Sequence, residues 1–253
     1  MITPEGCFKY FCLPFGAKNA PKYYQHVMDT IIQEGKDKGY VFCYIDDLII
    51  ASDTFDDHVE HLRAVFLMLR KANIKVGKAK AKFCMTEAKY CGKIITEDGL
   101  IQMDPALLKA IREYPMPRNV SAVREFLGMT GHYREFIDNF AEIAEPLSSL
   151  TGKKDRFEWG PNQTKAFLTL KSVMESSKVL MAVDYTKDVH MHTDASLIAS
   201  SCIVSQKDEK ERLRPVFCAS WVFNAAQRRY NAADRELLAL VWSTKKVQIS
   251  ITR

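Results

Sequence analysis

The sequence contains no Cys-x-x-Cys pair, although seven cysteines are present among its 253 residues. Their spacing gives no disulfide framework, so we expect free thiols in a reducing compartment. No apolar run reaches the ~18 residues that a membrane span requires, and the first residues form no signal-peptide pattern. These absences exclude a disulfide-stabilised secreted module and predict an intracellular protein without a membrane partner.

Arginine is absent between Lys71 and Lys93, and Glu87 is the only acidic residue there, whereas lysine occurs seven times. The net charge of the whole chain is only +5, so the positive charge of this segment is local. A lysine stripe attracts phosphate backbones through counterion release, but it is also common on an ordinary solvated face. Composition leaves both interpretations open.

Internal repeats and low-complexity tracts are also absent, and a hydrophobic content of 47% is enough for a sizeable core. The length fits one large domain or two small ones, of which we expect two. The predicted fold class is α/β, in its α+β form.

The first half of the chain predicts a helix followed by a hairpin. Asn19 and Pro21 are typical of a helix start, and apolar residues then recur at helical spacing to about Gly35. Two β-prone runs, 40–44 and 48–51, flank Ile45-Asp46-Asp47. The pattern predicts a hairpin with carboxylates at its tip.

Further elements follow from capping and periodicity. Thr54 and Asp57 form a capping box before a long helix, and short strands are expected around Lys82 and Lys93. From Pro105 to Leu150 the pattern is helical, with breaks expected at Pro115, Pro117 and Gly128. Residues 189–194, 200–205 and 215–220 predict three short strands, and residues 225–246 a helix. This second α/β unit should begin between Leu150 and Asp184.

The adjacent carboxylates Asp46 and Asp47 are the strongest candidate site. Two unpaired charges beside apolar strands are costly, and a divalent metal would relieve that cost. Phosphoryl transfer uses two such ions. If residues 44–47 are considered alone, the alternative interpretation is an ordinary Asp-Asp hairpin turn.

The surrounding motifs resemble one family. Residues 13–21 read Leu-Pro-Phe-Gly-Ala-Lys-Asn-Ala-Pro, residues 44–47 read Tyr-Ile-Asp-Asp, and Tyr90-Cys91-Gly92 follows. In order and spacing they resemble the reverse transcriptase of a gypsy-type LTR retrotransposon Pol polyprotein. The resemblance covers essentially the whole chain, through His58, His61, Lys80, Phe83, Asp104-Pro105, Arg124, Phe126-Leu127-Gly128, Tyr133-Arg134 and Phe136-Ile137.

That resemblance implies a role for several residues. Asp46 and Asp47 would be catalytic carboxylates that hold Mg²⁺ or Mn²⁺. The implied partners are an RNA template, a DNA primer, their hybrid, deoxynucleoside triphosphates and the remaining Pol segments, in a cytoplasmic virus-like particle or the nucleus. The implied substrate-binding residues are Phe15, Gly16, Gln25, Tyr44, Lys80, Tyr90 and Gly92.

A second motif set lies near the C-terminus, at 192–196, 230–231 and 235–240. It resembles the first two carboxylate stations of a retroelement RNase H, so Asp194 and Glu236 would be catalytic and metal-binding. His190 and His192 share a strand face with Asp194 and could imitate a metal site, but we interpret them as neighbours. His58 and His61 could suggest zinc, yet nothing nearby completes four ligands, so a structural role is expected.

The resemblance divides the chain into a partial polymerase palm (1–98), a mainly helical thumb or connection region (99–180) and the N-terminal part of an RNase H-like domain (181–253). A further polymerase Asp and a third RNase H carboxylate of the family are not found, and Gly77, Ala81, Cys91 and Lys93 depart from its usual residues. We therefore expect weak or no activity from these residues alone. The alternatives are a non-catalytic nucleic-acid-binding relic or domesticated module, and a chain that does not fold stably.

Overall fold

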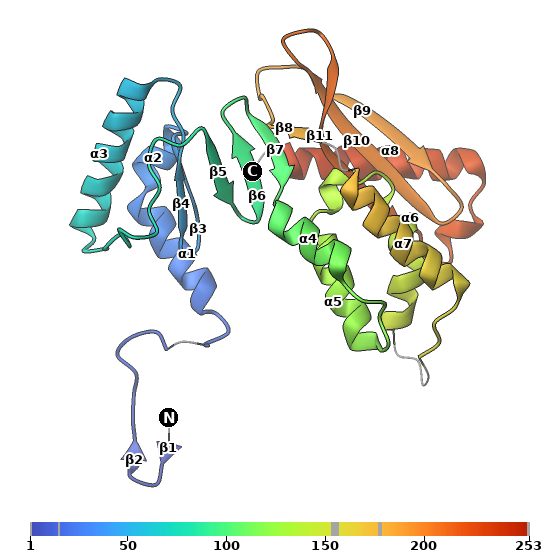
Figure 1. The fold of residues 1–253 in the computed structure, drawn as a ribbon, viewed down its shortest axis with the longest axis horizontal. Coiled ribbons are helices and arrows are strands. Elements are labelled where there is room, and N and C mark those ends of the chain that lie inside the picture. Colours follow the sequence, from blue (N-terminus) through green and yellow to red (C-terminus); the bar gives the residue numbers. More distant parts are fainter. Residues whose placement is uncertain (1, 15, 153–156, 177–178, 252–253) are drawn as a thin grey trace. The chain divides into compact units, whose positions relative to one another are not determined.

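The computed structural model describes residues 2–14, 16–152, 157–176 and 179–251 (Figure 1). Both helices and strands occur in each half of the chain, which confirms the mixed α/β class. The chain divides into two compact units, Met1–Cys91 and Gly92–Arg253. Within the described residues, no helix is both long and apolar enough to span a membrane.

In its described residues, the first unit contains two antiparallel hairpins and three helices. Its elements are β1 (Ile2–Thr3), β2 (Gly6–Cys7), α1 (Ala20–Ile31), α2 (Gln33–Asp37), β3 (Val41–Tyr44), β4 (Asp47–Ile50), α3 (Phe55–Lys71) and β5 (Glu87–Tyr90). A small core joins α1, α3 and the β3–β4 hairpin; its buried members are Met28, Ile32, Tyr40, Val41, Val65 and Leu69. The predicted hairpin is thus confirmed, while the predicted first helix is divided at Ile32 into α1 and α2.

Helix α3 begins where its capping residue predicts. The Thr54 hydroxyl accepts a hydrogen bond from the Asp57 backbone N–H at 3.2 Å and donates one to the Asp57 carboxylate at 2.6 Å. Acidic residues in the first turn and Arg70 and Lys71 in the last turn complement the helix dipole. The predicted start of this helix is confirmed.

Two details of the predicted secondary structure are wrong. No strand forms around Lys82; β5 begins only at Glu87, because Cys84 has φ +51°, which interrupts an extended backbone. Gly128 does not break a helix but lies inside α5 (Val120–Gly131), where buried Val123 and Phe126 anchor the helix. Their packing outweighs the roughly 1 kcal/mol that a helical glycine costs.

The second unit joins a helical layer to two antiparallel sheets. Its first part holds β6 (Lys93–Thr96), β7 (Leu100–Met103), α4 (Pro105–Glu113), α5, the 3₁₀ turns η1 (Arg134–Phe136) and η2 (Ser149–Thr151), α6 (Phe140–Ser148), α7 (Pro161–Glu175) and β8 (Leu180–Met181). The strand predicted near Lys93 is confirmed as β6, and β7 pairs with both β6 and β8. The break at Pro115 and Pro117 is confirmed, since α4 ends before them and α5 starts after them.

The core of this unit is larger and rich in aromatic side chains. The Phe126 ring lies 5.6 Å from that of Tyr114 and 4.6 Å from that of Phe167. Tyr133 is fully buried, and its hydroxyl donates to the Gly92 carbonyl at 2.6 Å and accepts from the Asp104 N–H at 3.3 Å. The side chains of α4, α5, α6 and α7 therefore pack into one continuous cluster.

The three strands predicted in the second half are confirmed as β9 (His190–Ala195), β10 (Ala199–Lys207) and β11 (Leu213–Val222), in the sheet order β11-β10-β9. The last helix, α8 (Ala232–Ile251), begins later than predicted, after the short turn η3 (Gln227–Arg229). Asn231 caps it through a hydrogen bond from the Asp234 N–H at 2.9 Å.

The helical layer is attached directly to the three-stranded sheet. The Arg134 guanidinium donates to the Ser220 carbonyl at 2.7 Å, and the Ser220 hydroxyl accepts from the Ala141 N–H at 2.9 Å. The buried Cys218 thiol donates to the Asp138 carboxylate at 2.9 Å. Strand β11 therefore packs against η1 and α6 as part of a single unit.

Candidate active sites

Asp46 and Asp47 lie at the tip of the β3–β4 hairpin. Tyr44 and Asp47 form the last paired position, so Ile45 and Asp46 make a two-residue turn. Ile45 has φ +53°, an unusual value for a β-branched residue. Both carboxylates and the Tyr44 side chain are exposed. The turn thus presents two adjacent acidic groups to solvent.

The turn is tied to α1 by one side chain. The Gln25 amide oxygen accepts from the Ile45 N–H at 2.6 Å, and its amide nitrogen donates to the Cys43 carbonyl at 3.0 Å. The same nitrogen lies 3.3 Å from the Asp29 carboxylate, which also accepts from the Lys36 ammonium at 2.8 Å. A hydrogen bond from Lys36 lowers the pKa of Asp29, so this carboxylate stays ionised and orients the amide.

The carboxylates of the turn contribute to the pKa shifts of three nearby titratable groups. Burial raises the pKa of the Cys43 thiol to about 11, and Asp29, Asp46 and Asp47 add to the shift. Burial, Cys91 and Cys43, followed by Asp47, raise the pKa of Tyr90. Burial and then Asp46 raise the pKa of Tyr24. The fold therefore brings Tyr90 close to a carboxylate far from it in sequence.

Sequence patterns identified Tyr90 but neither Tyr24 nor Cys43. The available signals were that Tyr24 directly precedes Gln25 and that Cys43 directly precedes the Tyr-Ile-Asp-Asp segment. Neither residue has an unusual spacing of its own. Their place beside the turn follows from the packing of α1 on β3.

Other predicted substrate-binding residues are dispersed. Phe15 lies outside the described residues. Gly16 has φ +82° and is exposed in the loop before α1, and Lys80 is exposed in a turn where its N–H donates to the Gly77 carbonyl at 2.9 Å. Among the residues that the structure describes, no hydrogen bond or ion pair joins Gly16 or Lys80 to the hairpin.

Gly92 opens the second unit and occupies a position that favours glycine. It has φ +75°, and a Cβ there would lie 2.7 Å from the His132 ring nitrogen Nε2. Its carbonyl accepts the Tyr133 hydroxyl. This backbone bend is therefore fixed by packing within the second unit.

Asp194 and Glu236 lie on neighbouring elements of the second unit. Asp194 is near the end of β9, paired with Ser201 of β10, and its side chain is exposed. Helix α8 contacts both β9 and β10. Glu236 in its first turns is exposed, whereas the adjacent Arg235 is only 9% exposed. The helix thus directs the carboxylate to solvent and the guanidinium inward.

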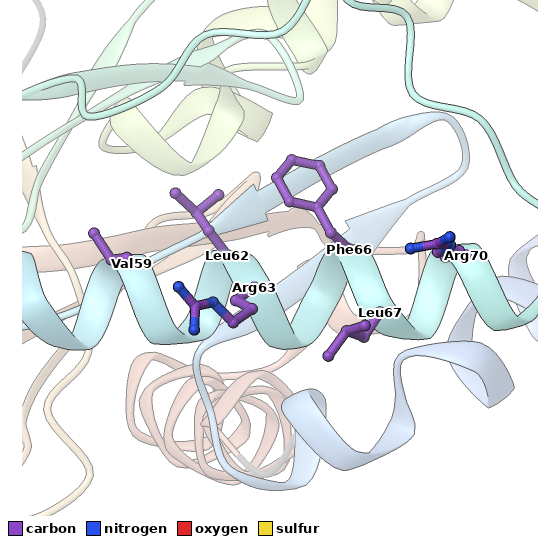
Figure 2. A pocket seen from close by; sticks show the side chains of 6 residues that line it. All are labelled: Val59, Leu62, Arg63, Phe66, Leu67 and Arg70. Atoms are coloured by element: carbon purple, nitrogen blue, oxygen red, sulfur yellow. The ribbon is translucent and has the colours of Figure 1, made fainter.

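A hollow of about 370 Å³ on the described surface is formed by other residues. It lies along α3, with Val59, Leu62 and Phe66 on one side of the helix (Figure 2). Its remaining lining residues are Arg63, Leu67 and Arg70. None of the predicted site residues lines it.

In the described part of the chain, no three His, Cys, Asp or Glu residues are grouped closely enough to hold an ion. The Ser52 hydroxyl lies 2.7 Å from Nδ1 of His61 and 3.3 Å from Nδ1 of His58, and Tyr40 stacks on His61 at 3.9 Å. These contacts agree with a structural role for both histidines.

Two protein-family models match the chain, one in its N-terminal part and one in its C-terminal part. Residues 1–95 match the family model of reverse transcriptase (RNA-dependent DNA polymerase), and residues 159–252 match an RNase H-like domain found in reverse transcriptase. Both families generally use divalent metal ions.

Sequence relatives of the chain include Pol polyproteins of transposons. The chain is 37% identical to a retrovirus-related Pol polyprotein from transposon opus of Drosophila melanogaster and 34% identical to the transposon Tf2-3 polyprotein of Schizosaccharomyces pombe. These alignments cover 95% and 96% of this chain but only 25% and 18% of the relatives.

The fold is similar to that of foamy viral protease-reverse transcriptases. The dRH protein in complex with double-stranded DNA gives a TM-score of 0.80 at 23% identity, covering 93% of this chain and 41% of that one. A complex with RNA/DNA hybrid gives 0.78 at 22% identity, covering 93% and 31%. The chain therefore carries a reverse transcriptase segment and an RNase H-like segment, and its relatives are Pol polyproteins of LTR transposons.

Proposed function

We propose that the first unit takes part in RNA-directed DNA synthesis, with Asp46 and Asp47 as the carboxylates that hold Mg²⁺ or Mn²⁺. The observation that carries this proposal is the exposed pair of carboxylates on a hairpin turn that α1 supports. The proposed partners are an RNA template, a DNA primer and deoxynucleoside triphosphates. Tyr44 and Tyr90 flank the carboxylates from β3 and β5 and would contact the nucleic acid.

The donor set fits magnesium. Mg²⁺ is commonly held by one or two carboxylates together with substrate phosphates and water, and rarely by an all-protein cage. Two adjacent exposed carboxylates meet that requirement without a third protein ligand. When bound, such ions activate the attacking hydroxyl and stabilise the leaving phosphate. The contribution of the chain itself is to hold the two carboxylates side by side at the hairpin tip.

In the second unit we propose that Asp194 and Glu236 take part in cleavage of RNA within an RNA/DNA hybrid. Both are exposed carboxylates on adjoining elements, β9 and α8. Oxygen ligands again suit Mg²⁺ or Mn²⁺. Hydrolysis of a labelled hybrid by the chain, compared with an Asp194→Asn, Glu236→Gln double variant, tests this part. Equal hydrolysis by both proteins would refute it.

Metal binding and primer extension test the polymerase proposal. Mn²⁺ binding is followed by electron paramagnetic resonance, and extension of a DNA primer on an RNA template by gel. We expect Mn²⁺ binding that Asp46→Asn and Asp47→Asn each weaken more than roughly tenfold, because loss of an outer-shell partner alone already costs about 10–100-fold. Asp53→Asn, at an exposed Asp outside the turn, is the matched control.

The family's further carboxylates are not identified among these residues, so weak or absent primer extension is expected because two-metal catalysis depends on placement. Any product must disappear with Asp46→Asn. Mn²⁺ affinity that is the same in wild type and both hairpin variants, or product that persists in Asp46→Asn, would contradict the proposal.

The lysines support a second candidate function, nucleic-acid binding without turnover. Lys75, Lys78, Lys80 and Lys82 are all exposed, and no ion pair with a carboxylate is found for them in the described residues. Replacing all four with Gln should reduce the slope of log affinity against log salt by about 0.9 for each phosphate that the lysines neutralise. A slope on duplex DNA unchanged by the four substitutions would exclude the lysines as the binding surface.

A further inference from the structure

We propose that Gln25 is a positioning residue for the Asp46–Asp47 turn, acting through the backbone on both sides of Tyr44 and not through the nucleotide. This inference rests on the proposed metal-binding function of the turn. Its basis is a side chain in α1 that contacts the backbone of a hairpin eighteen to twenty residues away.

The turn needs support from outside the hairpin. Ile45 adopts φ +53°, a region that steric contact with Cβ disfavours for L residues other than glycine. The Gln25 amide oxygen accepts the Ile45 N–H at 2.6 Å while its nitrogen donates to the Cys43 carbonyl at 3.0 Å. One planar amide therefore fixes the residues directly before and after Tyr44.

The hydrogen-bonding capacity of Gln25 is almost fully used. An amide has two N–H donors and two acceptor lone pairs. Both donors are engaged, with Cys43 and Asp29, and one lone pair accepts from Ile45. Asp29, paired with Lys36, keeps the nitrogen on its own side, so the oxygen must face the turn. No N–H remains for a nucleotide, which leaves positioning as the role of this side chain.

Cys43 offers an independent reporter of the closed turn. Its thiol donates to the Ile45 carbonyl at 3.3 Å, and burial raises the pKa of the thiol to about 11. The thiolate is the reactive form, so Cys43 should alkylate slowly while the turn is closed. Cys7, Cys12 and Cys84 are exposed and provide internal references.

The experiment compares Gln25→Met, Gln25→Glu and Gln33→Met in the full 253-residue chain. Gln33 also donates to an Asp four residues on, Asp37, but it is exposed on α2, and the described residues show no hydrogen bond from its side chain to the hairpin, which makes it a matched control. The readouts are Mn²⁺ affinity by electron paramagnetic resonance and Cys43 alkylation by mass spectrometry. Far-UV circular dichroism checks folding, and isosteric Gln25→Glu decides if Gln25→Met is unfolded.

We expect both Gln25 variants to lower Mn²⁺ affinity by about 10–100-fold, the usual effect of removing an outer-shell support. Cys43 alkylation should accelerate, because opening of the turn exposes the thiol and allows its pKa to fall towards the ordinary value. Gln33→Met should change neither. Provided that wild-type Mn²⁺ binding depends on Asp46, unchanged Mn²⁺ affinity in folded Gln25 variants overturns the positioning role, whether or not Cys43 alkylation changes.

Failure of the proposed function gives a different result. In that case wild-type Mn²⁺ binding would be absent or insensitive to Asp46→Asn. The alkylation rate of Cys43 would then still decide whether Gln25 holds the turn. If that rate is also the same in wild type and both Gln25 variants, the turn does not depend on Gln25 and the inference fails separately.

Discussion

The two pairs of candidate carboxylates are supported in different ways. Asp194 lies in β9, whose residues pair with β10 along the whole strand, so its backbone is fixed by a ladder of main-chain hydrogen bonds. Asp46 lies in a turn that closes a two-stranded hairpin and is held from α1 by the Gln25 amide. On the positioning role that we propose for Gln25, one side-chain replacement should release the turn, whereas replacing one side chain of β9 leaves its main-chain ladder in place.

The hydrophobic core of the first unit is also smaller than that of the second unit. The first unit has a small cluster around Val41, Val65 and Leu69, while the second has a continuous cluster around Phe126 and Leu170. All three tryptophans, Trp159, Trp221 and Trp242, belong to the second unit. Tryptophan fluorescence therefore reports the unfolding of the second unit alone, and the two units can be compared experimentally.

The largest effect is expected from Phe126→Ala. Its side chain is fully buried between Tyr114 and Phe167, and removing a buried Phe costs about 3–5 kcal/mol. The urea midpoint followed by tryptophan fluorescence should fall. Leu168→Ala, at a leucine that is 54% exposed on α7, should change the free energy of unfolding by no more than about 0.5 kcal/mol. Equal shifts in the two variants would contradict the assigned core.

Leu69→Ala tests the first unit in the same way. Leu69 is 2% exposed on α3, and the replacement should cost about 2–5 kcal/mol. Hydrogen exchange followed by mass spectrometry should accelerate in α3 and β3 while the tryptophan transition stays in place. Leu67 of the same helix is 51% exposed, so Leu67→Ala is the control. A matching shift of the tryptophan transition would mean that the units do not unfold separately.

Replacing a helix-capping residue, one in each unit, should lower the free energy of unfolding by a smaller amount. Thr54 caps α3 and Asn119 caps α5, each through a hydrogen bond from a backbone N–H three residues on. Replacing either with Ala should cost about 0.5–2 kcal/mol. Thr54→Ala should alter only hydrogen exchange in the first unit and Asn119→Ala only the tryptophan transition. The reverse assignment would refute the division of the two caps between the units.

Local patterns predicted the elements that depend on neighbouring residues. The β-prone runs around Ile45 gave the hairpin, and Thr54 gave the start of α3, because turn and cap chemistry act within a few residues. The strand predicted near Lys82 does not form, because Cys84 has a left-handed backbone that interrupts the extended chain. The helix break predicted at Gly128 is also absent, because tertiary packing stabilises α5.

Contacts between distant residues could not be predicted in this way. The pairing of Leu100 with Met181 joins β7 to β8 across four helices, and no local pattern encodes that register. Family motifs pointed to Gln25 and Tyr90, but not to the hydrogen bonds of Gln25 with the turn or to the charge of Asp47 beside Tyr90. The roles of Asp46, Asp47, Asp194 and Glu236 stay predictions.

The smallest effect is expected on the acid sensitivity of each unit, which two Asp→Asn replacements test separately. A hydrogen bond from Lys36 lowers the pKa of Asp29. The ionised Asp29 therefore contributes fully to the stability of the first unit at neutral pH. This contribution is lost as the pH falls below the ordinary pKa of ~3.9 and then through the lowered pKa. As for other partly exposed pairs, we expect less than about 1 kcal/mol. Asp29→Asn should make hydrogen exchange in the first unit less sensitive to acid between about pH 5 and pH 2. Backbone N–H groups and Arg212 lower the pKa of Asp208 in the second unit, so Asp208→Asn should affect only the tryptophan transition. Acid sensitivity of the first unit that persists in full with Asp29→Asn would show that other carboxylates cause it.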